Sequence, residues 1–167
     1  MSDQLHQAKR PVTMLAGPYG HPLHPILVTV PIGAWVTSLV FDLASHVVGD
    51  PGFLARGSLW LIAIGVIGAL AAAMFGFLDF LAIPPRTAAF RTARVHLVLN
   101  LAVTAAYGVA WAWRSGDHAG PVPVGQIALS AICLAVLSVS GYLGGMLAYR
   151  YGVRVADETT QAEGFRS

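Results

Sequence analysis

The stretch "SLWLIAIGVIGALAAAMFGFLDFLAI", residues Ser58–Ile83, decides the fold because it contains only one charged side chain, Asp79. A helix rises about 1.5 Å per residue, so a helix of this length exceeds the roughly 30 Å thickness of the hydrocarbon core of a bilayer. Runs this long and this apolar are typical of membrane-spanning helices. The stretch therefore predicts a helix that crosses a membrane.

Three further apolar runs accompany it, at about Ile26–Val48, Val95–Trp113 and Val124–Tyr149. The 167-residue chain is 56% hydrophobic and 11% charged, with a mean hydropathy of +0.65, which is more apolar surface than a soluble core of this size can bury. We expect an all-α, four-helix transmembrane bundle with up-down-up-down topology. It would comprise a polar arm (1–24), the membrane domain (25–149) and a polar tail (150–167), with short loops near residues 49–57 and 114–123.

The positive charges predict the orientation of the bundle. Eight lie before the first run, between the second and third runs, or after the fourth, and only two lie in the other loops. Because Lys and Arg concentrate on the cytoplasmic side, both termini are expected in the cytoplasm. This distribution also disfavours nucleic acid as a partner, despite the pI of about 9.0. The eight are Lys9, Arg10, Arg86, Arg91, Arg94, Arg150, Arg154 and Arg166; the two are Arg56 and Arg114.

Prolines predict how the first helix begins. Pro25 suits the first turn of a helix, where its missing N–H would be unpaired in any case, and this places His24 near the N-cap. Pro31 either kinks this helix or begins its regular part, and the sequence leaves both readings open. Pro84 and Pro85 end the second helix.

Small residues recur at helical spacing on two of the expected helices and predict faces for close helix packing. In lipid, helices associate by close packing and hydrogen bonding rather than by the hydrophobic effect. The second helix carries Gly68 and Gly76 on such a face, and the fourth carries a Gly-x-x-x-Gly seam at Gly141 and Gly145.

Polar side chains should also turn toward the interior of the bundle. The up-down topology places His24, Asp79 and His96 together at the cytoplasmic rim, with Asn100 one turn further along the third helix. Asp42 belongs to the same set of inward polar residues but lies toward the opposite end. There we expect it and His46 near Arg56 or Trp60.

Four interpretations of these polar residues remain open. Asp79 could accept hydrogen bonds from His96 or from free N–H groups at a helix start. His24 and His96 could ligate the iron of a haem b, or bind a metal ion together with Asp79. A histidine beside a carboxylate could also relay protons. Motifs of soluble enzymes are absent, and the single cysteine, Cys133, is expected to be a buried small residue.

Four segments together resemble a family of bacterial membrane proteins, the domain of unknown function 2231. They are "HPLHPILVTVPIGAW" (21–35), "GFLD" (76–79), "HLVLN" (96–100) and "GYLGGMLAYRYGV" (141–153). The likeness extends over roughly Gly20–Val155 and implies a multi-pass protein of the bacterial cytoplasmic membrane.

That resemblance implies membrane electron transfer for some members of the family, because related sequences are sometimes joined to Rieske-type iron–sulfur or cytochrome c domains. It favours His24, Asp42, Asp79, His96 and Asn100 as positions of interest. The chain departs from the family pattern at two positions: it has Thr29 in "VTVPIG" where many members carry a polar or acidic residue before "PIG", and Met146 follows "GYLGG" where some members have histidine. Met146 is a weaker candidate axial ligand. The expected function is a small redox-associated membrane subunit that contacts lipid and a separate Rieske-type or cytochrome c partner; the alternative is a cofactor-free structural or interaction protein.

Overall fold

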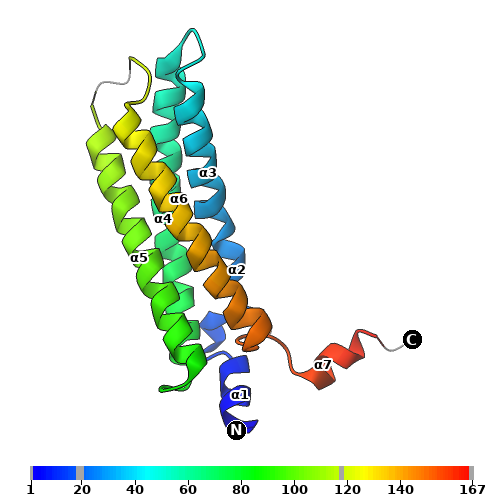
Figure 1. Cartoon of the computed structure of the whole chain (residues 1–167). Helices are drawn as coiled ribbons and strands as arrows, with labels where there is room; N and C mark the ends of the chain where they lie inside the picture. Colours follow the sequence, from blue (N-terminus) through cyan, green and yellow to red (C-terminus); the bar gives the residue numbers. More distant parts are fainter. Residues whose placement is uncertain (1, 18–20, 117–118, 166–167) are drawn as a thin grey trace.

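The computed structural model describes residues 2–17, 21–116 and 119–165, so parts of the predicted arm, of the second loop and of the tail lie outside it. Within those ranges the chain is helical and contains no strand. Four long helical segments run side by side as an up-and-down bundle (Figure 1). The elements are α1 (Ser2–Lys9), η1 (Met14–Ala16), α2 (His24–Leu27), α3 (Thr29–Ala44), α4 (Pro51–Leu81), α5 (Ala88–Arg114), α6 (Val124–Gly145), the π-helical turn η3 (Met146–Arg150) and α7 (Glu158–Glu163).

The four segments have the length and apolarity of membrane spans: 24–44, 51–81, 88–114 and 124–150. Large apolar side chains cover their outer surface, among them Ile67, Val98, Ile132 and Val139. In water such a surface would be strongly unfavourable, whereas lipid solvates it. The all-helical membrane architecture expected from the sequence is therefore confirmed.

The first span is interrupted at Val28, between α2 and α3. Pro31 lies in the first turn of α3 and has no N–H to donate to the carbonyl of Leu27, so this backbone hydrogen bond of the helix is missing. Val28 itself keeps helical dihedral angles, and Ile32 N–H donates to its carbonyl at 3.3 Å. Pro31 thus lies in the first turn of α3, which begins at Thr29, and the span continues through it.

Two helices begin earlier than the apolar runs indicated, at Pro51 rather than Ser58 and at Ala88 rather than Val95. In each case a polar side chain caps the helix. The Asp50 carboxylate accepts from the N–H of Phe53 at 3.4 Å, and the Thr87 hydroxyl accepts from the N–H of Phe90 at 3.1 Å. The caps lie beyond the apolar stretches, which explains the difference.

The core lies where the four helices meet. Trp35 of α3 and Tyr107 of α5 stack with ring centroids 4.2 Å apart, surrounded by Ile62, Val103 and Cys133. Gly65 allows this arrangement because a Cβ there would overlap the Trp35 indole.

Hydrogen bonds close both ends of the bundle. At the loop end (residues 45–50, 115–116 and 119–123), the N–H of Val122 donates to Ser45 Oγ at 3.0 Å, and His46 Nε2 donates to the carbonyl of Val122 at 2.9 Å. At the terminal end (residues 2–17, 82–87 and 151–156), the N–H of Arg154 donates to the carbonyl of Ala8 at 3.0 Å. The arm and the tail therefore lie against each other.

Candidate histidine site

His24 lies at the start of α2 and reaches across to α4. Its Nδ1 is 2.8 Å from the carbonyl oxygen of Ala72. A Cβ at Gly76, one turn after Ala72, would lie only 2.8 Å from the same nitrogen. The glycine therefore uncovers a helical carbonyl and lets it accept a second hydrogen bond.

His96 repeats this arrangement on the other pair of helices. It lies on α5, and its Nδ1 is 2.8 Å from the carbonyl oxygen of Ser140 on α6. Gly144, one turn after Ser140, leaves room for the ring, because a Cβ there would lie 3.1 Å from His96 Cε1. Asn100 Nδ2 contacts the other ring nitrogen, Nε2, at 3.2 Å and donates to Ser140 Oγ at 2.7 Å.

The carbonyl contacts fix the tautomer of both histidines. A carbonyl can only accept, so Nδ1 carries the hydrogen in each ring and the neutral ring keeps its lone pair on Nε2. The two rings lie next to each other, with centroids 6.3 Å apart and planes at 90°. His24 and His96 thus lie side by side inside the bundle, and Nε2 of each neutral ring can accept a hydrogen bond or bind a metal.

Asp79 does not bond to either histidine. Its Oδ1 lies 2.8 Å from Arg154 Nε, although the angles are not those of a hydrogen bond. Arg154 also donates from Nη2 to the carbonyl of Ala16 at 3.1 Å, which attaches the tail to the arm. The carboxylate expected to accept from His96 or from a helix start is therefore paired with a residue of the tail.

Asp42 lies in a separate polar cluster at the loop end, and its partner is Arg114 rather than Arg56 or Trp60. Arg114 donates to the two carboxylate oxygens at 2.7 and 2.8 Å, and both side chains are buried. The same guanidinium donates to the hydroxyls of Ser58 and Ser130 at 3.1 and 3.0 Å and to the carbonyl of Gln126 at 3.2 Å.

Arg114 was not predicted as a candidate site residue, although a repeated spacing in the sequence indicates that it pairs with Asp42. Asp42 and Arg114 are 72 residues apart, and the same spacing separates His24 from His96 and Trp35 from Tyr107. Each of these pairs is in contact. The two helical hairpins, residues 24–81 and 88–145, therefore present equivalent positions to each other, as the halves of a twofold-symmetric dimer do.

The remaining predicted residues lie apart from the histidines. Gly68 is against Val30 and Pro31, where a Cβ would approach to 2.7 Å. A Cβ at Gly141 would have no atom within 4 Å apart from its own stretch of helix, and the nearest atom to a Cβ at Gly145 belongs to Tyr149, 4.0 Å away. At this end of α6 it is Gly144, rather than Gly141 or Gly145, that lies against another helix. Met146 begins the π-helical turn η3, and no described contact joins its side chain to a histidine.

Comparison with known proteins gives a family but no activity. No curated protein and no solved structure matches the chain significantly. The family model described as "predicted membrane protein (DUF2231)" matches residues 20–157, a range that includes all four spans, both histidines and the Asp42–Arg114 pair. The chain therefore belongs to the DUF2231 family of membrane proteins.

Proposed function

We propose that the chain is a membrane electron-transfer subunit in which His24 and His96 hold the iron of a haem b. The observation that supports this is the geometry of the two rings: both Nδ1 atoms donate to backbone carbonyls, and both Nε2 atoms keep a lone pair. Histidine ligands of metals are commonly fixed in this way, and the hydrogen bond makes the ligating nitrogen more basic. Haem supplies reversible one-electron transfer when it is bound.

The two rings lie close enough together for both histidines to contact one bound group, with ring centroids 6.3 Å apart. Small residues lie against the two rings, namely Ala72 and Gly76 on α4 and Ser140 and Gly144 on α6.

The number of donors favours haem over a bare metal ion. Among the described residues, no three His, Cys, Asp or Glu side chains gather where they could hold a metal. An ion held by protein alone usually needs three or four ligands, whereas the macrocycle of haem leaves only two positions for the protein. His24 and His96 provide two. Asn100 would release only its contact with His96 Nε2, the longest of its contacts at 3.2 Å.

The proposal also includes the orientation of the bundle in the membrane and the protein with which it exchanges electrons. The excess of Lys and Arg at the terminal end supports a cytoplasmic location for that end in a bacterial membrane. The histidines would then lie in the half of the bilayer near the cytoplasm. A separate Rieske-type or cytochrome c protein would exchange electrons with the subunit.

An absorption spectrum of the purified protein tests the proposal. After expression with added haem precursor, the wild type should show a Soret band and sharpened visible bands on reduction with dithionite. His24→Ala and His96→Ala should each lose most of that absorbance. His46→Ala is the matched control, because His46 bonds to Val122 at the loop end. A colourless wild type, or histidine variants with unchanged spectra, would refute the haem site.

The second candidate is a cofactor-free structural or interaction protein. It is favoured by the two histidine–carbonyl bonds, which already connect α2 to α4 and α5 to α6. On this reading His24→Ala and His96→Ala lower stability and the protein never carries haem. A proton relay through Asp79 is less favoured, because Arg154 pairs with that carboxylate.

A further inference from the structure

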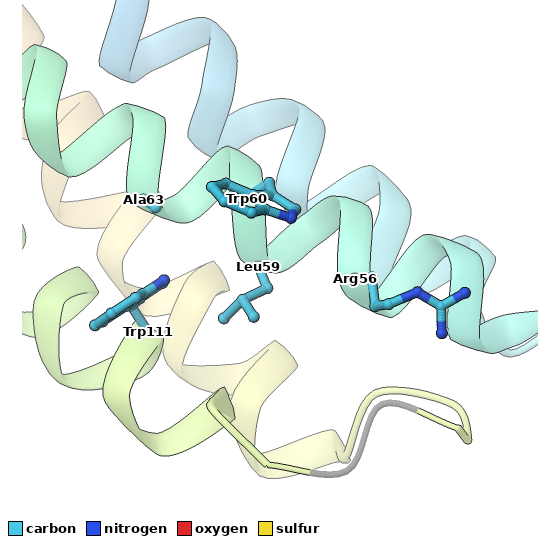
Figure 2. Close-up of a pocket in the computed structure, with 5 residues that line it drawn as sticks. All are labelled: Arg56, Leu59, Trp60, Ala63 and Trp111. Carbon is cyan, nitrogen blue, oxygen red and sulfur yellow. The ribbon is translucent and has the colours of Figure 1, made fainter.

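A shallow groove of about 240 Å³ lies between α4 and α5 at the loop end. Figure 2 shows Arg56, Trp60 and Ala63 along α4, Trp111 on α5, and Leu59 between the two helices. The groove opens to the lipid-facing side, since the Trp60 side chain is 70% exposed. It is separate from the histidine site and from the Asp42–Arg114 cluster.

Among the described residues that line this groove, Arg56 alone carries a charge. Within the described ranges it forms neither a hydrogen bond nor an ion pair, and it is exposed. Arg114 differs in both respects, because it is buried and carries five hydrogen bonds. A cation beside apolar walls, without an acidic partner among the residues that the structure describes, is complementary to an anionic group from outside.

The position of the groove fits the boundary between hydrocarbon and headgroups. Arg56 lies in the second turn of α4, and Trp111 lies in the last turn of α5. Tryptophan and arginine side chains both favour that boundary, where an apolar body and a polar tip are solvated together. From Arg56 to Ala63 the helix rises about 10 Å, which leads from the headgroup level into the hydrocarbon.

We propose that this groove binds one glycerophospholipid of the leaflet at the loop end. Arg56 pairs with the phosphate, and one acyl chain lies over Leu59 and Ala63 between the indoles of Trp60 and Trp111. Pockets for whole small molecules usually measure about 300–1,000 Å³, so this groove suits a segment of a longer molecule. A phospholipid carries its anion and its chain in the order that the groove presents.

Native mass spectrometry tests the site, with the protein in detergent and phosphatidylglycerol as the probe. Arg56→Gln should lower the lipid-bound fraction about two- to fivefold, which is within the range for one exposed charged contact. Arg56→Lys should keep part of the binding, because the charge remains. Arg94→Gln is the matched control, since it removes an exposed arginine near the opposite end of α5.

Inorganic phosphate in large excess should not displace the lipid, because the acyl chain contributes to binding. Equal lipid retention by the wild type and Arg56→Gln would overturn the proposal. So would an equal loss in Arg94→Gln, which would indicate general attraction to anionic lipid. Displacement by inorganic phosphate would show a simple anion site without a role for the groove.

Discussion

Replacing Asp42 by leucine should lower the free energy of unfolding by about 3–5 kcal/mol, the usual cost of removing one partner of a buried ion pair. The carboxylate is fully buried and accepts two hydrogen bonds from Arg114, at 2.7 and 2.8 Å. Hydrogen bonds to charged groups contribute about 1.5–3 kcal/mol each, so two of them give a similar figure. After the substitution the guanidinium would remain buried with only the hydroxyls of Ser58 and Ser130 and one carbonyl as acceptors.

Arg114→Leu should cost a similar amount, because it leaves the Asp42 carboxylate buried beside one serine hydroxyl. The double variant removes both charges together and should be much closer to the wild type, within about 2 kcal/mol. The two substitutions are then strongly non-additive, with a coupling energy of about 3 kcal/mol or more.

Unfolding can be followed at Cys133, which is the single cysteine of the sequence and is buried. A thiol-reactive dye reports its exposure during a denaturant titration of the protein in detergent micelles. Arg56→Leu is the control, since that arginine is exposed and should change stability by less than about 0.5 kcal/mol. A double variant as unstable as the sum of the single variants would refute the reasoning, and so would an Asp42→Leu variant as stable as the wild type.

Two further predictions concern a glycine contact and a helix cap. Gly76→Leu should lower the free energy of unfolding by about 1–3 kcal/mol in the same titration, because the new side chain would displace the His24 ring. Gly108→Leu should have little effect, because nothing lies within 4 Å of a Cβ there. Equal effects of the two substitutions would contradict this prediction. The hydrogen bond from the backbone N–H of Thr160 lowers the pKa of Asp157, so this cap on α7 should persist above the ordinary pKa and be lost only as the pH falls through the lowered value. NMR titration of the Asp157 carboxyl and of amide exchange in α7 checks this, and a midpoint at or above the ordinary value would contradict it.

The sequence was sufficient to predict the spans, because lipid imposes one strong requirement on every residue of a run. Helix boundaries were less predictable. The segments 51–57 and 88–94 are helical but contain Arg56, Arg91 and Arg94, so hydropathy excluded them. Their starts depend on single capping side chains, Asp50 and Thr87, whose effect is local.

The meeting of His24 and His96 was predictable from topology, because both residues lie near the same end of antiparallel helices. Their actual partners were not. The carbonyls of Ala72 and Ser140 are present in any helix, and only the glycines that follow them make these two accessible. Hydropathy treated Arg114 as a loop charge because it ends an apolar run, and its pairing with Asp42 depends on how the helices are aligned.

The equivalence of the two hairpins has a consequence for assembly in the membrane. Asp42 and Arg114 occupy matching positions but have opposite signs. Two first hairpins placed face to face would bring carboxylate against carboxylate in hydrocarbon, and two second hairpins would bring guanidinium against guanidinium. Only unlike hairpins neutralise both charges. In hydrocarbon, this ion pair therefore favours contact between the first and second hairpins over contact between two copies of the same hairpin.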